Sequence, residues 1–148
     1  MLSKSGVYAL WDEDQVGAKL YVGQSENVAK RLEEHHKSKP FWRKAIVFTS
    51  DNSMLNAGHI RWLEHNLIKR VQESGSRTLE NGNTPSATQL SLQDTALAKI
   101  FFNRMLEIMP LTGLTAFESK SDEDAHQQDV FEASSTNDTI IVPTGKTG

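Results

Sequence analysis

The first 50 residues contain three short segments with the apolar patterning of β-strands. In the run at 6–11, Tyr8 and Leu10 share one face of a strand, and the residues between them take the other face. A polar stretch that ends in glycine follows, and KLYVGQ at 19–24 then reads as a second strand. The two runs predict an antiparallel hairpin, and the β-rich run at 45–48 predicts a third strand.

Three longer segments have the periodicity of helices. The first covers about 28–38 and stops before Pro40, because proline cannot continue a helix. The second covers about 57–73 and ends near Gly75, a residue type common just after a helix. The third, at about 92–109, carries apolar side chains at helical spacing. The predicted strands and helices alternate along the first part of the chain, which indicates a mixed α/β architecture.

The length of 148 residues allows one domain with a sizeable core. From Glu118 onward the chain is acidic and poor in large apolar residues, apart from the β-rich TIIV at 139–142. Such a composition buries too little apolar surface to offset the entropy of ordering. We therefore predict a domain at 1–118, which includes the helix at about 92–109, and an acidic, flexible tail or linker at 119–148.

Composition narrows the class of protein. The chain contains no cysteine, which excludes a disulfide-linked partner and thiolate metal sites, so a metal ion must be held by oxygen or imidazole ligands. No stretch approaches 18 apolar residues, and the N-terminus lacks the apolar run of a signal peptide. A cytoplasmic protein without a membrane partner is the expectation.

The charge is unevenly distributed along the chain. Residues 1–90 carry 12 Lys and Arg against 10 Asp and Glu, and residues 91–148 carry 4 against 9. The first part therefore has a net charge of +2 and the second −5, within a total of −3. A basic run in the first part could meet a phosphate backbone, although many surface helices look similar. Its members, besides Arg31, are Lys30, Lys37, Lys39, Arg43 and Lys44.

One carboxylate stands out in the second helix. At 100° per residue, Glu64 projects close to the centre of an apolar stripe that includes Leu67, Ile68 and Val71. Burying an ionised carboxylate without a partner costs several kcal/mol, so Glu64 needs a cation, a hydrogen-bonding cluster or an opening to solvent. An isolated case is more often a structural salt bridge. The alternative is a single-carboxylate site for Mg²⁺, which keeps most of its waters.

Two further features have both an ordinary and a chemical explanation. Arg31 and His35 are four residues apart in a helix and face the same way, which suits phosphate recognition but also describes many surface helices. Tyr8 and Tyr21 lie on adjacent strands, and Gly6 and Gly23 leave room for another backbone or a ligand. Paired strand tyrosines are usually packing residues.

Together, in this order and spacing, these residues resemble the GIY-YIG nuclease family. The resemblance covers about residues 5–85 and rests on Gly6-Val7-Tyr8, Tyr21-Val22-Gly23, Arg31, His35, Glu64 and a later Asn. Valine replaces the middle isoleucine of each tripeptide. The run from Phe41 to Pro85 is similar to a bacterial subgroup of the family with no assigned cellular role, whose members often carry extra segments on both sides.

The resemblance implies a small α/β (α+β) domain with a three-stranded antiparallel sheet flanked by helices. It also implies divalent-metal-dependent endonuclease cleavage of DNA with Mg²⁺ or Mn²⁺. Glu64 would bind the metal, Tyr8 or Tyr21 would orient or deprotonate the attacking water, and Arg31 would offset charge on phosphorus. His35 would support by hydrogen bonding, and Asn81 or the nearby Asn83 would fill the late Asn position.

One departure from the family leaves a second function open. Many relatives place a Lys directly after the second tripeptide, where this chain has Gln24. A phenol has a reference pKa of about 10 and needs help from a metal or cation to act as a base at neutral pH. The alternative to an endonuclease is therefore a nucleic-acid binding module that does not cleave. A protein-interaction domain based on the acidic C-terminal half is a third possibility.

Overall fold

The central feature of the computed structural model is a twisted sheet with helices on both faces. The structure describes residues 4–50, 55–82, 85–118 and 139–142. The elements are β1 (Gly6–Trp11), β2 (Lys19–Ser25), α1 (Val28–Ser38), β3 (Lys44–Thr49), α2 (Ala57–Ser74), β4 (Thr78–Leu79), α3 (Leu92–Ile108), the 3₁₀ helix η1 (Met109–Thr112) and β5 (Thr139–Val142). The mixed α/β (α+β) class predicted from the sequence is confirmed, and so is the C-terminal helix.

The predicted count of three strands was too low, because the described residues form a sheet of five in the order β4-β2-β1-β3-β5. The three predicted strands form its antiparallel centre, with β1 between β2 and β3. Strand β4 is only two residues long and pairs parallel to β2, so it has no periodicity to detect. Strand β5 pairs antiparallel to β3 from the far end of the chain. Apart from β5, the predicted tail at 119–148 lies outside the described residues.

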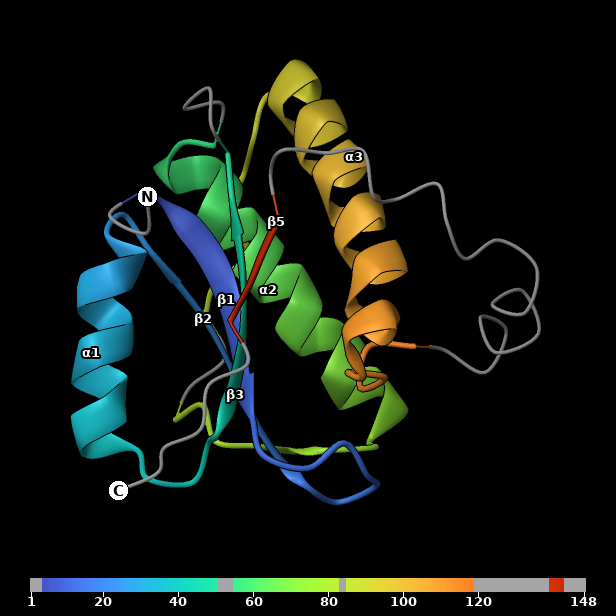
Figure 1. Ribbon diagram of the computed structural model, residues 1–148. Coiled ribbons are helices and arrows are strands. Elements are labelled where there is room, and N and C mark those ends of the chain that lie inside the picture. The colour runs from blue at the N-terminus through green and yellow to red at the C-terminus, as the bar shows by residue number, and fades with distance from the viewer. Residues whose placement is uncertain (1–3, 51–54, 83–84, 119–138, 143–148) are drawn as a thin grey trace.

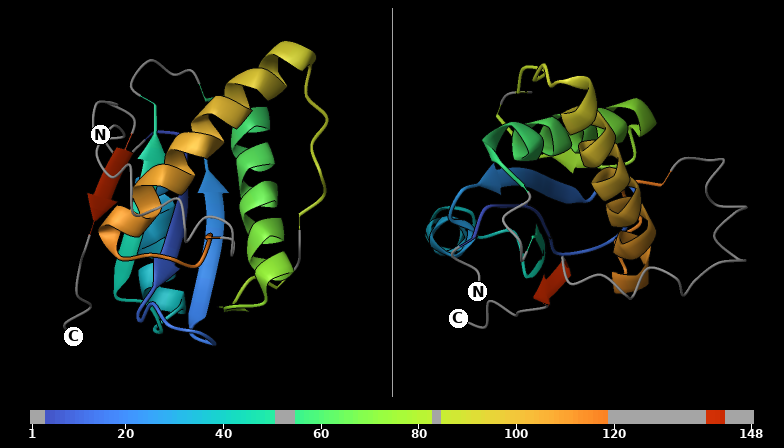
Figure 2. Two further views of the ribbon diagram at one scale, coloured as in Figure 1. Left: turned by 90° about the vertical axis from the view of Figure 1, so that its right-hand side faces the viewer. Right: turned by 90° about the horizontal axis from the view of Figure 1, so that it is seen from above.

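The two faces of the sheet bury different sets of side chains. Helix α1 covers one face, and α2 and α3 cover the other, with α3 running obliquely across it (Figures 1 and 2). Because successive side chains of a strand point to opposite faces, alternate residues of β1 separate into the two cores. The α1 face is built from Tyr8, Leu10, Val28, Trp42, Ala45 and Val47. The larger core on the other face includes Val7, Ala9, Val22, Ile46, Ile60, Leu63, Leu67, Met105 and Phe117.

Each helix begins and ends where local chemistry allows. The side chain of Asn27 accepts a hydrogen bond from the Lys30 amide at the start of α1. Asn56 and His59 form a reciprocal capping pair at the start of α2, in which His59 takes the position that Glu or Gln usually fills. Gly75 ends α2 in a left-handed conformation with φ of 63°, which glycine adopts without a Cβ clash.

The segment after α3 is tied to the hairpin that carries both tyrosines. Asp14, in the turn between β1 and β2, accepts hydrogen bonds from the amide and hydroxyl of Thr115 at 3.0 and 2.9 Å. The same carboxylate pairs with Arg77 at 2.7 Å, where the Arg77 side chain is only 6% exposed. Aromatic contact adds to this packing, since Trp62 of α2 meets Phe102 of α3 edge-on at 5.9 Å. The chain beyond α2 therefore fixes the end of the hairpin.

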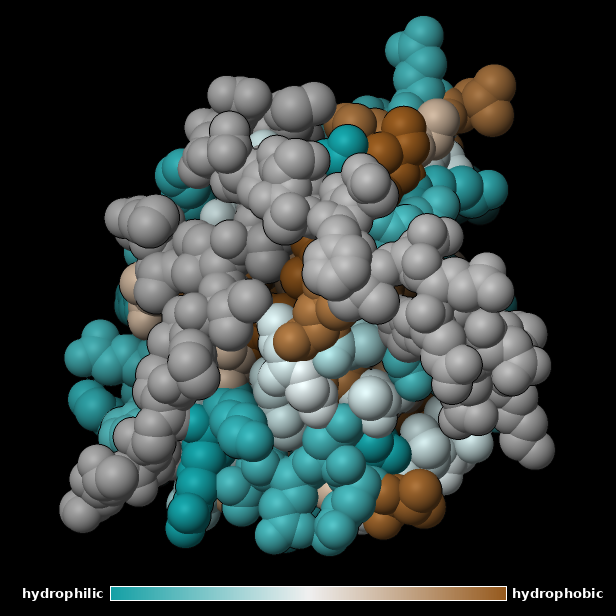
Figure 3. All heavy atoms as spheres, turned by 45° about the vertical axis from the view of Figure 1, so that its right-hand side comes forward, coloured by the Kyte–Doolittle hydropathy of each residue, from teal (hydrophilic) through white to brown (hydrophobic). Residues whose placement is uncertain are grey.

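The visible surface is mostly hydrophilic, with apolar side chains at separate places. Figure 3 shows hydrophilic side chains along the lower part of the visible face, and apolar side chains beside hydrophilic ones at the end where α3 begins. Leu92, at the first position of α3, is 88% exposed, and Ile100 is 56% exposed. Isolated exposed apolar residues of this kind are common on soluble proteins.

Candidate active site

The two tyrosines lie on the α1 face of the hairpin, where the strand register brings their rings together. Tyr8 pairs with Gly23 across the strands and Leu10 pairs with Tyr21, so the phenols occupy diagonal positions on one face. Their ring centroids are 6.3 Å apart, and the ring planes differ by 28°. Tyr8 is buried, with 1% of its surface exposed, whereas Tyr21 is half-buried. Tyr21 is therefore the phenol that solvent or a substrate reaches.

Gly6 and Gly23 make room for atoms of the protein itself. A Cβ at Gly23 would lie 2.5 Å from the ring and hydroxyl of Tyr8, so only glycine lets that ring cross β2. A Cβ at Gly6 would lie 2.5 Å from the carbonyl oxygen of Phe48 and 3.2 Å from a methyl group of Val28. The gap at Gly23, expected to admit a backbone or a ligand, is filled by the side chain of Tyr8 instead.

His35 joins the phenols from the last turn of α1. Its Nε2 atom lies 2.8 Å from the hydroxyl of Tyr8 in a buried hydrogen bond, and His35 is only 5% exposed. The imidazole centroid is also 4.8 Å from the centroid of Tyr21. The backbone carbonyl of His35 accepts a hydrogen bond from the indole of Trp42 at 3.3 Å. Two phenols and one imidazole thus form a contiguous cluster of titratable groups.

Arg31, one turn before His35, supplies a positive charge that acts on both phenols. Its exposed guanidinium pairs with Glu34 at 3.1 Å, and this hydrogen bond is the main reason that its pKa lies above the ordinary value. Burial raises the pKa of Tyr8 and Tyr21, while the charge of Arg31 opposes the rise in both phenols. A pair with Glu34 on the surface is weak, so a phosphate group can displace it at little cost.

Glu64 comes from α2, the helix on the opposite face of the sheet. Strand β4 pairs with only the first two residues of β2, and the side chain of Asn81 continues this pairing at Val22, next to Tyr21. The carboxylate of Glu64 acts on both phenols, since its charge raises the pKa of Tyr8 and of Tyr21. The acid, the guanidinium and the two rings therefore belong to one electrostatic site.

The environment of Glu64 leaves its negative charge incompletely balanced. Burial raises the pKa of Glu64 to about 7, and the charges of Arg31 and Arg61 oppose this rise. Among the described residues, Glu64 has no hydrogen-bond or ion-pair partner, and no group of three or more His, Asp or Glu could enclose a metal ion. A half-buried carboxylate of this kind fits a cation that takes one protein oxygen and keeps its waters, as Mg²⁺ does.

The side chain of Asn81 is used by the fold. Its amide oxygen accepts a hydrogen bond from the Val22 amide at 3.1 Å, and its amide nitrogen donates to the Val22 carbonyl at 2.6 Å. The Glu80 amide donates to Leu20 just before it, so Asn81 extends the parallel pairing of β4 along β2. Asn81 thus holds the strand that carries Tyr21, and Asn83 lies outside the described residues.

The basic residues lie on and after α1. Lys30, Lys37, Arg43 and Lys44 are exposed, and Lys39 is partly buried at the end of α1. The ammonium group of Lys39 lies 4.7 Å from the ring centroid of Tyr21, an attractive cation–π arrangement. Reasoning from the sequence did not identify this contact or the bond from Trp42 to His35. Both depend on how the segment at 39–43 folds back, which no periodicity reveals.

Fold and site together define a small α/β domain with an acid, a guanidinium and two phenols around one electrostatic centre. Residues 4–66 match the family model of the GIY-YIG catalytic domain, which supports the resemblance of this segment to the GIY-YIG nuclease family. The match includes Tyr8, Tyr21, Arg31, His35 and Glu64, and it ends before Asn81 and α3. A domain of this kind implies a nucleic acid substrate.

No curated protein and no solved structure gave a significant match to the chain. No helix among the described residues has the length and apolar character needed to cross a bilayer.

Proposed function

We propose that this protein is a divalent-metal-dependent endonuclease that hydrolyses phosphodiester bonds in DNA. The proposal is supported by the cluster of Tyr8, Tyr21 and His35 and by the charges of Arg31 and Glu64, which act on both phenols. Hydrolysis of a phosphodiester needs an activated water, stabilisation of negative charge on phosphorus and a way to stabilise the leaving oxygen. The cluster offers a chemical group for each need.

We assign to Tyr21 the role of orienting the attacking water. It is more exposed than Tyr8, and its ring contacts both Lys39 and His35. Its hydroxyl orients the water by accepting or donating a hydrogen bond. Because burial raises the pKa of both phenols, neither ionises on its own at neutral pH. Activation therefore depends on a cation nearby, which the exposed side of the cluster can admit.

Tyr8 and His35 form a pair behind Tyr21 that can hold a proton. The neutral imidazole of His35 can accept a hydrogen bond from the Tyr8 hydroxyl at Nε2, and their 2.8 Å contact is short enough for proton transfer. Burial of both groups excludes bulk water from this contact. The pair therefore orients the phenols and provides a place for the proton that leaves the attacking water.

Arg31 and Glu64 complete the site from two directions. The guanidinium of Arg31 would release Glu34 and pair with a nonbridging phosphate oxygen, where its charge offsets the charge that develops in the transition state. Glu64 would hold the divalent ion, Mg²⁺ or Mn²⁺. When bound there, such an ion would supply Lewis-acid stabilisation of the negative charge that develops on the phosphodiester.

Nicking of a supercoiled plasmid in Mg²⁺ or Mn²⁺ tests the proposal. Glu64→Ala and Arg31→Ala are each expected to slow nicking by a hundredfold or more, roughly the loss seen when one charge-stabilising group is removed. Glu73→Ala on α2 and Arg104→Ala on α3 are matched controls, since both residues are exposed and lie outside the cluster. Equal nicking by all the proteins would reject the proposal. DNA binding without nicking in any divalent metal would favour a non-cleaving module.

A further inference from the structure

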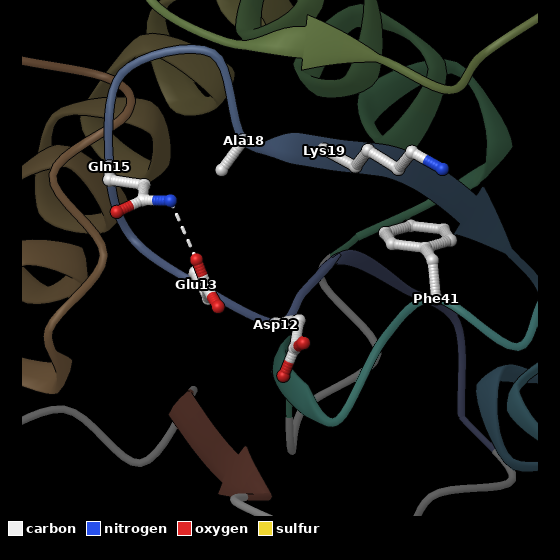
Figure 4. Close-up of a pocket in the computed structure, with 6 residues that line it drawn as sticks. All are labelled: Asp12, Glu13, Gln15, Ala18, Lys19 and Phe41. Carbon is white, nitrogen blue, oxygen red and sulfur yellow. Dashed lines mark hydrogen bonds between the residues drawn. The ribbon is translucent and has the colours of Figure 1, made fainter.

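A small hollow opens at the turn end of the hairpin, on the same face as the phenols. It has a volume of about 280 Å³ and is lined by Asp12, Glu13, Gln15, Ala18, Lys19 and Phe41. Figure 4 shows the Phe41 ring and the Lys19 side chain on one side and the oxygen-bearing side chains of the turn on the other. This volume is near the lower end of roughly 300–1,000 Å³ for small-molecule sites, so it suits one ring system.

The hollow adjoins the candidate active site. Lys19 is two residues before Tyr21 on β2, and residues two apart in a strand point to the same face about 7 Å apart. Phe41 and Tyr21 are both partly buried and pack against the same core. Lys39, two residues before Phe41, lies over the ring of Tyr21 at 4.7 Å. A nucleotide whose phosphate reaches Tyr21 would therefore bring its neighbouring base to the hollow.

The lining combines an aromatic ring with hydrogen-bond acceptors. The part-exposed ring of Phe41 offers a flat apolar face, on which any base can stack. Asp12, Glu13 and Gln15 present side-chain oxygens, which accept hydrogen bonds from an exocyclic amino group. The two carboxylates also repel a phosphate, so the hollow favours a base over the backbone of the nucleic acid.

The present partners of these side chains lie near the surface. Glu13 accepts from the Gln15 amide at 2.6 Å, and Asp12 is 3.6 Å from Arg43. Lys19 is 3.6 Å from Glu80. Exposed contacts of this kind contribute little free energy, so a ligand can replace them.

We propose that this hollow binds one unpaired nucleobase that carries an amino group, next to the phosphodiester that the active site cuts. The inference rests on the proposed nuclease function and specifies its substrate: DNA with an unpaired nucleotide beside the cleavage point, as in a bulge, flap or single strand. A base inside a continuous duplex is stacked and paired, and it enters such a hollow only after it is flipped out at an energetic cost. Flipping out an unpaired base costs less free energy, so we expect the hollow to bind unpaired bases more tightly.

Binding by a variant that does not cleave separates this inference from the catalytic one. Glu64→Gln protein is mixed, in Mg²⁺, with a duplex that contains a single unpaired 2-aminopurine, a fluorescent base with an exocyclic amino group. We expect its fluorescence to be quenched on binding, because stacking on an aromatic ring changes the environment of the base. Phe41→Leu in the same background keeps apolar packing but removes the aromatic face. It is expected to abolish quenching and weaken binding roughly tenfold.

Three controls keep this test specific. Phe41→Tyr restores an aromatic ring and is expected to restore quenching. Leu92→Ala removes an apolar side chain that is 88% exposed on α3, and quenching is expected to be unchanged. Replacing the unpaired base by thymine, which lacks an amino group, should weaken binding several-fold. Asp12→Ala combined with Glu13→Ala should remove that difference between the bases.

The outcomes distinguish the base-binding inference from the nuclease proposal. Equal affinity for the bulged and the fully paired duplex would overturn the base-binding inference and leave the nuclease proposal intact. The base-binding inference would also be overturned if the Phe41→Leu protein quenched the fluorescence as strongly as the Glu64→Gln protein does. Failure of the wild-type protein to cleave any DNA in Mg²⁺ or Mn²⁺ would reject the nuclease proposal instead. Base-dependent quenching in that case would still support the hollow as a nucleobase site.

Discussion

Replacing Glu64 by glutamine is expected to stabilise the fold and to abolish cleavage. Burial raises the pKa of this half-buried carboxyl from 4.5 to about 7. Since one pKa unit corresponds to about 1.4 kcal/mol, the full rise would represent at most about 3.5 kcal/mol. Solvent screening of a part-exposed group reduces this, and we expect roughly 1–2 kcal/mol. Glutamine has nearly the same shape but no charge, so it avoids this cost.

The direction in which pH changes the stability difference between wild type and Glu64→Gln follows from proton binding by Glu64. Below pH 4.5 the carboxyl is protonated in both folded and unfolded chains, so Glu64 has no influence on stability through ionisation. Between pH 4.5 and about 7 the unfolded chain releases the proton while the folded chain retains it. Stability of the wild-type protein therefore falls with rising pH in this window. The advantage of Glu64→Gln grows across the same window and is complete above about pH 7.

Urea unfolding of both proteins at about pH 4.5, 6 and 8, without divalent metal, measures this difference directly. Adding Mg²⁺ at the highest pH should stabilise the wild-type protein and leave Glu64→Gln unchanged, because binding to the folded state alone raises stability. Plasmid nicking is measured on the same preparations. If Glu64→Gln has the same stability as wild type at that pH, or responds equally to Mg²⁺, the assignment of an uncompensated metal-binding carboxylate is wrong.

Three further predictions concern the phenols and the support of the hairpin. Tyr21→Phe should lower the nicking rate at least a hundredfold and Tyr8→Phe less, because only Tyr21 is placed to meet the water; single-turnover rates measure the difference. Asn81→Ala should destabilise the fold by about 1–3 kcal/mol in urea, since two backbone hydrogen bonds on β2 lose their partner. Asp14→Ala should cost about 3 kcal/mol by thermal or urea unfolding, because it leaves the 6%-exposed guanidinium of Arg77 without its carboxylate.

Each of these predictions has an outcome that contradicts it. An equal or larger effect of Tyr8→Phe on the single-turnover rate would place the water at Tyr8. Asn81→Ala protein of normal stability but no activity would indicate a chemical role in place of the structural one. Stability of Asp14→Ala within about 0.5 kcal/mol of wild type, the usual range for surface changes, would show that solvent replaces the carboxylate.

Local patterns predicted most of the regular structure, and tertiary contacts determined the rest. The predicted helices at 28–38, 57–73 and 92–109 agree with α1, α2 and α3 within one residue at each end. Strong periodicity and capping side chains fix these boundaries locally. The pairing of β4 and β5 depends on segments far from their partners in sequence, and the two residues of β4 carry no pattern at all.

In the candidate site, too, local patterns were predictable from the sequence and tertiary contacts were not. Helical spacing places Arg31 and His35 on one face, and strand alternation places the two tyrosines on another, so their types and directions were predictable. The hydrogen bond from His35 to Tyr8 joins residues 27 apart in the chain, and it depends on how α1 lies on the sheet. Equally, nothing in the sequence indicates that Gly23 makes room for the Tyr8 ring, because that requires the register of two strands.

The position of the phenols depends on parts of the chain beyond the catalytic-domain match. That match ends at residue 66, yet Asn81 holds the edge of β2, and Arg77 with Thr115 fixes the turn of the hairpin through Asp14. Catalytic groups must be held within a fraction of an ångström of their working geometry, and a two-stranded hairpin alone is marginally stable. The segments after α2 therefore act as the support of the site, although they contribute none of its charged groups.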